Sequence, residues 1–139
     1  SELTKIMHAH INDILIVDDT PENLTVLRQM LTEEGYRVRP ALSGEIALKA
    51  VQADLPHLIL LDVMMPGMDG PTTLQAIRQC PDFARTPAVF MTAKVQPEEV
   101  DGYLAQGAAD VIPKPFDPMA LSDRIREIWH ALDPGIRSD

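Results

Sequence analysis

The chain has 139 residues, a usual length for one compact domain, and a domain of this size buries about two-thirds of the surface of its unfolded chain. Its 21 acidic and 12 basic residues give a net charge of −9, which repels nucleic-acid phosphates and anionic lipid heads. We therefore expect no direct binding of nucleic acid. The sequence also has no run of about 18 apolar residues that would predict a membrane span. The single cysteine, Cys80, cannot form an internal disulfide, which fits a reducing cytoplasm.

The first predicted strand is the apolar run 14–17, which stops abruptly at the acidic pair 18–19, as a buried strand does at the edge of a sheet. Thr20 and Pro21 then supply an N-cap and a first-turn proline. Apolar residues recur at helical spacing from there until Gly35. The sequence therefore predicts a strand followed directly by a helix.

The rest of the chain repeats this pairing of a strand with a helix. Further strands are predicted over 36–42, 58–61, 88–91 and 110–112. Further helices are predicted over 44–51, 72–79, 97–107 and 117–132, and the segment 65–71 is predicted to be a loop. Strict alternation favours an α/β fold with a doubly wound parallel sheet, because each parallel neighbour is reached through a crossover helix.

We predict a single domain over residues 13–132. Residues 1–12 form a polar leader of no evident structure, which we expect to be flexible, and residues 133–139 form a short C-terminal tail. No stretch has the composition of a linker, and no internal repeat is visible.

Polar side chains follow four of the predicted strands. They are Asp18, Asp19, Asp62, Thr92 and Lys114. In an open parallel sheet, ligands bind beyond the carboxyl ends of the strands, where the residues after each apolar run lie. We therefore expect these side chains to meet at one edge of the sheet.

Three crowded carboxylates repel one another, each pair by roughly 4 kcal/mol at about 4 Å and an effective dielectric constant near 20. A cation must therefore lie among them, and oxygen ligands without His or Cys favour Mg²⁺, or Mn²⁺, over Zn²⁺. Lys114 adds a positive charge that does not occupy the metal position. A metal ion, a lysine and a hydroxyl around one carboxylate suit a phosphoryl group, because all three stabilise charge on its oxygens during in-line transfer. Carboxylates are also nucleophiles that form aspartyl phosphates.

Four segments resemble the motifs of response-regulator receiver domains. They are Ile-Leu-Ile-Val-Asp-Asp at 14–19, Leu-Asp-Val-Met-Met-Pro-Gly-Met-Asp-Gly at 61–70, Met-Thr-Ala at 91–93 and Lys-Pro-Phe at 114–116. Each segment alone is a weak signal, but together they follow the order and spacing of the family. The resemblance covers about residues 14–132, which is nearly the whole chain.

The resemblance implies a flavodoxin-like (βα)₅ fold with strand order 2-1-3-4-5. It makes Asp62 the phosphoacceptor and assigns the binding of phosphoryl oxygens to Thr92, Lys114 and the amide of Ala93. It also suggests a cis peptide bond between Lys114 and Pro115. The residues that it assigns to Mg²⁺ are Asp18, Asp19, Asp62 and, through its backbone carbonyl, Met64.

Receiver domains take their phosphoryl group from the phosphohistidine of a histidine kinase or of a histidine phosphotransfer protein. The resemblance therefore implies a cytoplasmic signalling switch that catalyses only its own phosphorylation and dephosphorylation. Its output would pass through the face made by the fourth helix, the fifth strand and the fifth helix, toward a partner or a second copy of the chain. Composition does not decide whether the chain acts alone or belongs to a longer regulator or hybrid kinase.

Three positions bear on how such a switch works. Many receivers have an aromatic residue three positions before the lysine, but here that residue is Val111, so the output coupling must differ or rely on backbone movement after Thr92. Met64 and Lys94 lie two residues past Asp62 and Thr92, where the family tunes access of water to the acyl phosphate. We expect the bulky Met64 to slow autodephosphorylation.

Three alternatives are weighed against this reading. A haloacid-dehalogenase-like phosphatase also uses an aspartyl nucleophile and Mg²⁺, but its aspartates are separated by one residue, whereas Asp18 and Asp19 are adjacent. A flavodoxin-like electron carrier should have a loop rich in Ser, Thr and Gly after the first strand. A degenerate receiver used only for docking should lack some of the functional residues, and this chain has the complete set.

Overall fold

The structure, a computed structural model, describes residues 13–132, so the leader and tail predicted at 1–12 and 133–139 lie outside the described residues. The strands are β1 (Asp13–Val17), β2 (Arg37–Ala41), β3 (Leu58–Asp62), β4 (Ala88–Thr92) and β5 (Asp110–Pro113). The helices are α2 (Pro21–Glu33), α3 (Gly44–Ala53), α4 (Gly70–Arg78), α5 (Pro97–Ala105) and α6 (Pro118–Leu132), with a short 3₁₀ helix, η1, at Pro81–Phe83. None of the described helices is long and apolar enough to cross a membrane.

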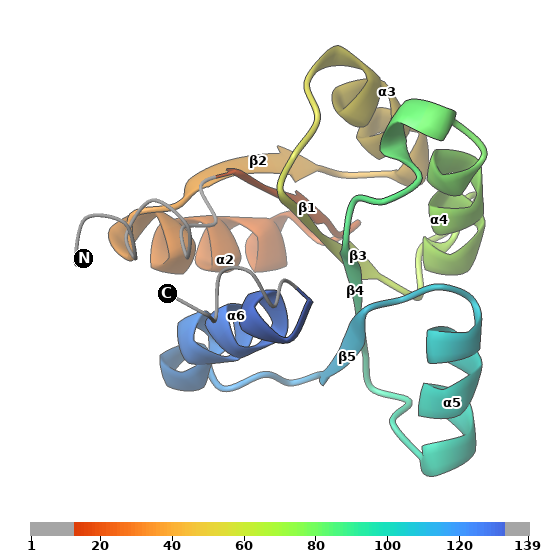
Figure 1. Cartoon of the computed structure of the whole chain (residues 1–139). Coiled ribbons are helices and arrows are strands. Elements are labelled where there is room, and N and C mark those ends of the chain that lie inside the picture. Colours follow the sequence, from red (N-terminus) through yellow and green to blue (C-terminus); the bar gives the residue numbers. More distant parts are fainter. Residues whose placement is uncertain (1–12, 133–139) are drawn as a thin grey trace.

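The five strands form one parallel sheet in the order β2-β1-β3-β4-β5, which confirms the predicted topology. Helices α2 and α6 cover one face of the sheet, and α3, α4 and α5 lie on the other (Figure 1). Successive residues of a strand point to opposite faces, so Ile14 and Ile16 pack with α2 and α6, whereas Leu15 and Val17 pack with α3 and α4. Because both faces are covered, β1, β3 and β4 are buried along their whole length.

The register of the sheet brings the carboxyl ends of the strands to one edge. Asp62 of β3 pairs with Met91 of β4, and Thr92 of β4 pairs with Pro113 of β5. The N–H of Asp18, just after β1, donates to the carbonyl of Ala41 at the end of β2. This edge therefore presents the polar residues that follow the strands.

The predicted start of α4 at Thr72 is wrong by two residues, because the helix begins at Gly70. The side chain of Asp69 caps this helix by accepting the N–H of Thr72 at 2.9 Å. Pro71, which was assigned to the loop, instead lies in the first turn of the helix, where its missing N–H costs nothing. The loop after β3 is therefore shorter than the sequence indicated.

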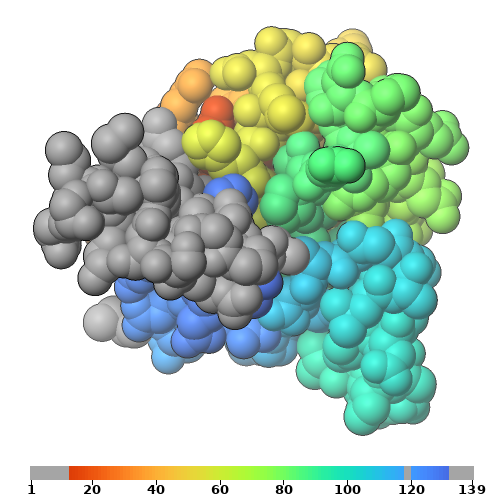
Figure 2. Space-filling view, viewed as in Figure 1, coloured from red at the N-terminus to blue at the C-terminus, as the bar shows by residue number. Residues whose placement is uncertain are grey.

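Helix α5 packs loosely, since none of its residues is buried. It stands out as a lobe, coloured cyan at the lower right of the space-filling view (Figure 2). The half-buried ring of Tyr103 in this helix meets the buried ring of Phe90 edge-on with 5.4 Å between ring centroids.

Candidate functional site

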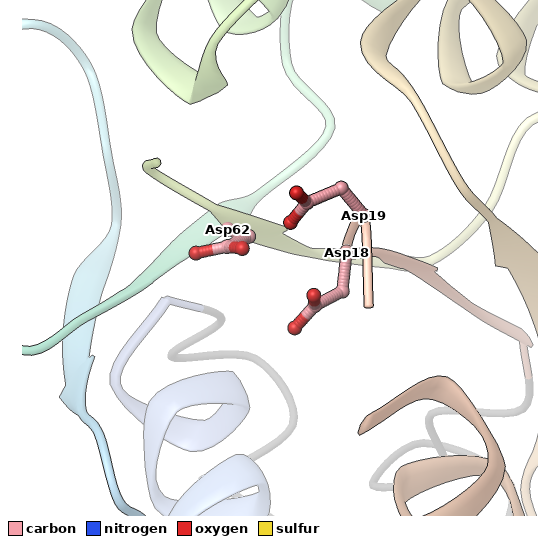
Figure 3. A group of neighbouring side chains, drawn as sticks. All are labelled: Asp18, Asp19 and Asp62. Atoms are coloured by element: carbon pink, nitrogen blue, oxygen red, sulfur yellow. The ribbon is translucent and has the colours of Figure 1, made fainter. Parts of the chain in front are cut away.

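Three carboxylates gather beyond the ends of β1 and β3. Figure 3 shows the side chains of Asp18, Asp19 and Asp62 together at this edge, and one oxygen from each lies within 4.8 Å of the other two. Asp18 and Asp62 are buried, and Asp19 is more exposed. The structure thus brings together the three carboxylates that the sequence assigned to a metal ion.

Lys114, which follows β5, lies between two of these carboxylates. Its Nζ atom is 3.0 Å from Oδ2 of Asp18 and 3.2 Å from Oδ1 of Asp62. The backbone N–H of Lys114 donates to the carbonyl of Thr92, which ties the ends of β4 and β5. The Lys114–Pro115 peptide bond is cis, as the resemblance suggested.

The charges of the site shift two pKa values in the same direction for different reasons. Burial raises the pKa of Asp62, the charge of Asp18 raises it further, and the nearby Lys114 and the Met64 N–H only partly oppose this rise. Burial alone would lower the pKa of Lys114, but its hydrogen bonds and ion pairs with Asp18 and Asp62 outweigh burial and raise it. The environment of Asp62 therefore disfavours the ionised form of this carboxylate. A further cation nearby would stabilise that form.

Thr92 is buried at the end of β4, the strand beside Asp62. Its hydroxyl accepts the backbone N–H of Lys94 at 3.0 Å, and its own hydroxyl proton remains free to donate. Ala93 and Lys94 are exposed in the loop that follows. The hydroxyl thus joins the edge of the site to a loop of exposed residues.

The loop after β3 is held close to the end of that strand. A Cβ atom added to Gly70 would lie 2.4 Å from the carbonyl oxygen of Asp62, and the N–H of Gly70 donates to the carbonyl of Val63 at 3.0 Å. The backbone N–H of Met64 donates to the Asp62 carboxylate, whereas the Met64 side chain is 63% exposed. The loop therefore wraps Asp62 with backbone groups and leaves one large apolar side chain at the entrance.

Sequence reasoning missed Asn23, whose amide nitrogen lies 3.2 Å from Oδ2 of Asp18. Thr20 occupies the N-cap position of α2 without a side-chain capping bond, but its N–H donates to Oδ1 of Asp18 at 2.9 Å. The N-cap residue and the first turn of α2 therefore contact both oxygens of Asp18. The only signal in the sequence was the position of Asn23 one helical turn after the acidic pair.

The donor set fits a hard divalent cation. It consists of carboxylate oxygens from three residues, with no thiolate or imidazole among them, and such oxygens are the ligands that Mg²⁺ takes in proteins. Burial and then the charge of Asp18 raise the pKa of Asp62, and Lys114 only partly opposes this rise. The residues present could therefore hold a metal ion.

Comparison with known proteins decides the family. The model of the response regulator receiver domain matches residues 14–126. The chain belongs to this family. Receiver domains work with histidine kinases in two-component signalling, and they typically do not catalyse reactions of other molecules.

Relatives of this receiver domain include longer proteins. Response regulator PleD of Caulobacter vibrioides is 41% identical over 116 residues, which are 83% of this chain and 25% of that protein. Transcriptional regulatory protein CpxR of Escherichia coli strain K12 is 43% identical over 119 residues, which are 84% of this chain and 49% of that protein. The chain thus corresponds to between a quarter and a half of these two relatives.

The receiver fold is equally clear from solved structures. The chemotaxis response regulator CheY4 of Vibrio cholerae matches with a TM-score of 0.81 at 29% identity, over 86% of this chain and 99% of that chain. The parallel sheet that the alternation of strands and helices predicted, and the strand order that the resemblance implied, are therefore those of an established receiver structure.

Proposed function

We propose that this receiver domain accepts a phosphoryl group on Asp62 from the phosphohistidine of a histidine kinase or of a histidine phosphotransfer protein. The observation that carries this proposal is the position of Asp62, a buried carboxylate flanked by the Lys114 ammonium and by an acidic pair suited to a divalent cation. An oxygen of Asp62 attacks phosphorus, the P–N bond breaks, and its electron pair leaves with the imidazole, which takes up a proton.

The ion in this proposal is Mg²⁺, with Mn²⁺ as a substitute. Asp18, Asp19, Asp62 and the backbone carbonyl of Met64 would hold it. When bound, the ion supplies positive charge next to the transferred phosphoryl oxygens. The same residues would serve the later hydrolysis, in which water attacks phosphorus and the Asp62 carboxylate leaves, so the domain controls how long its own phosphate lasts.

The remaining site residues act on the phosphoryl group directly. Lys114 pairs with a phosphoryl oxygen, the Thr92 hydroxyl donates to a second one, and the Ala93 amide donates as well. Movement of the Thr92 hydroxyl toward the phosphate would strain or break its bond with the Lys94 N–H, and the exposed loop that follows would shift. This is how a reaction at the edge of the sheet would reach the surface.

The output of the switch would be a change in affinity for a partner or for a second copy of the chain, through the face of α5, β5 and α6. Val111, buried in β5, offers no ring to report the movement of Thr92, so we place the coupling in the loop between β4 and α5. The net charge of −9 argues against direct nucleic-acid contact by this domain. We place the reaction in the cytoplasm, which suits the free Cys80.

The test is incubation of the whole chain with a small phosphodonor and Mg²⁺, followed by intact mass and peptide mapping. One phosphoryl increment confined to the peptide with Asp62 is expected, and it should vanish with EDTA or in Asp62→Asn. Asp101→Asn, an exposed acid on α5, is the matched control and should be labelled normally. Labelling elsewhere, or turnover of phosphate esters that survives Asp62→Asn and is lost in Asp18→Asn, would overturn the proposal in favour of a phosphatase.

A further inference from the structure

Asn23 contacts the innermost carboxylate of the site. It lies in the first turn of α2, and its Nδ2 atom donates to Oδ2 of Asp18, a side chain with no exposed surface. We propose that Asn23 is a positioning residue, whose amide fixes the Asp18 carboxylate in the orientation that binds the divalent ion. This inference rests on the function proposed above.

Both oxygens of Asp18 are held by donors. Oδ1 accepts the Thr20 N–H at 2.9 Å, and Oδ2 accepts both the Asn23 amide at 3.2 Å and the Lys114 ammonium at 3.0 Å. The final torsion of an aspartate is soft, so a carboxylate keeps a fixed plane only when each oxygen has a partner. Loss of the Asn23 amide would therefore leave the Lys114 ammonium as the donor that holds Oδ2 in place.

The two donors at Oδ2 differ in charge, and this difference makes Asn23 the better donor when a divalent ion is bound. A divalent ion beside Asp18 repels the Lys114 ammonium, which also pairs with Asp62 and would be drawn to an incoming phosphoryl group. The neutral amide of Asn23 meets no such repulsion. Asn23 is thus the donor that can keep Oδ2 oriented both with and without the ion.

The backbone around Asn23 is itself fixed. The N–H of Asn23 donates to the Thr20 carbonyl at 3.1 Å, and the helix that follows is anchored by the buried side chains of Leu24 and Leu27. The donor therefore sits on a rigid element, which is what an outer-sphere partner of a metal ligand requires.

The experiment measures Mg²⁺ affinity of the unphosphorylated whole chain by calorimetric titration. Asn23→Ala removes the donor, and Asn23→Leu removes it while keeping the size of the side chain. Both variants should bind Mg²⁺ about 10–100-fold more weakly than the parent, the usual cost of losing an outer-sphere partner. Thr25→Ala is the control, because this exposed hydroxyl on the same helix donates to the Pro21 carbonyl and not to Asp18, and its Mg²⁺ affinity should match the parent.

A second measurement separates positioning from general structure. Thermal unfolding in EDTA should place Asn23→Leu close to Thr25→Ala, while saturating Mg²⁺ should raise the melting temperature of Asn23→Leu less than that of the control. Mg²⁺ affinity equal to the parent in both Asn23 variants would overturn the inference and leave the proposed function standing. Absence of Mg²⁺ binding by the parent, together with no labelling of Asp62, would overturn both.

Discussion

The Nζ atom of Lys114 lies 3.2 Å from Oδ1 of Asp62, the carboxylate that we propose as phosphoacceptor. The same ammonium pairs with Asp18 at 3.0 Å, so one cation is shared by two buried acids. A phosphoryl group on Asp62 would bring negative charge to this ammonium and draw it away from Asp18. Lys114 would therefore link the state of the proposed phosphoacceptor, Asp62, to that of the proposed metal ligand, Asp18.

Lys114→Gln should lower both the stability of the unphosphorylated protein and the rate at which Asp62 is labelled. Loss of the cation leaves two buried carboxylates without their shared partner, which should lower the free energy of unfolding in EDTA by about 2 kcal/mol. The rate of labelling by a small phosphodonor should fall by about 100-fold, as for other donors that stabilise developing charge. Urea unfolding and timed mass spectra measure the two effects. Lys49→Gln, at an exposed position on α3, should change neither quantity, and a Lys114→Gln protein labelled at the parental rate would contradict the assignment.

Asp62→Asn should stabilise the protein at neutral pH in EDTA. The pKa of Asp62 is raised by burial and then by the charge of Asp18, so the folded state holds this proton more tightly than the unfolded state. Stability therefore falls as pH rises from the ordinary aspartate pKa through the raised one, and above both values the ionised Asp62 is a net cost. The melting temperature of Asp62→Asn should exceed that of the parent at pH 7, and the difference should shrink toward acid pH. A difference that stays constant from pH 7 to about pH 3 would contradict this account.

Gly70→Ala should disturb the loop after β3. An added Cβ would lie 2.4 Å from the carbonyl oxygen of Asp62 and 2.9 Å from Cα of Val63, and both of these are backbone atoms that cannot simply rotate away. We expect a loss of about 1–3 kcal/mol in the free energy of unfolding, together with slower labelling of Asp62. Gly102→Ala is the matched control on α5, because nothing lies within 4 Å of its added Cβ. The free energy of unfolding of Gly102→Ala should rise by about 0.5–1 kcal/mol. An equal rise in Gly70→Ala would contradict the prediction and show that the loop after β3 has room to move.

The sequence predicted the meeting of Asp18, Asp62 and Lys114 because parallel strands end at one edge, and the end of an apolar run is visible in one dimension. It did not predict Asn23, because that contact depends on how the first turn of α2 folds back over the end of β1. The start of α4 was missed for a similar reason. Asp69 could have been a loop residue or a cap, and only its distance of 2.9 Å from the Thr72 N–H decides between them.

The weak packing of α5 was also invisible to sequence reasoning. Its first-turn proline and its end near Gly107 predicted the helix correctly, but they say nothing of how far its side chains reach into the sheet. Val95, just before α5, is 41% exposed, and Leu104 within it is 42% exposed, although both side chains are apolar. Burial depends on neighbours that are distant in sequence, so it was not available from local spacing.

Met64→Asn should shorten the lifetime of the phosphorylated protein. Met64 is 63% exposed beside Asp62, and its flexible apolar side chain can cover the acyl phosphate without itself binding water. A small polar residue there would admit and orient water, so hydrolysis of the acyl phosphate should be faster. Intact mass measured at intervals after removal of the phosphodonor monitors this hydrolysis. Leu104→Asn, which replaces an exposed apolar residue on α5, should decay like the parent. A Met64→Asn phosphate that lasts as long as the parental one would contradict the role of this side chain.

Helix α5 should open locally far more often than α4, although each spans nine residues. Helix α4 buries four of its residues, whereas α5 buries none and depends on the edge-on contact between Tyr103 and Phe90. Amide hydrogen exchange of the unphosphorylated protein should therefore be at least about tenfold faster in α5, because few buried contacts oppose its opening. Tyr103→Ala should speed exchange in α5 alone, while Val95→Ala, at an exposed position, should not. Equal protection of the two helices would mean that α5 opens only with the whole domain, and the output face would then have to move as a rigid body.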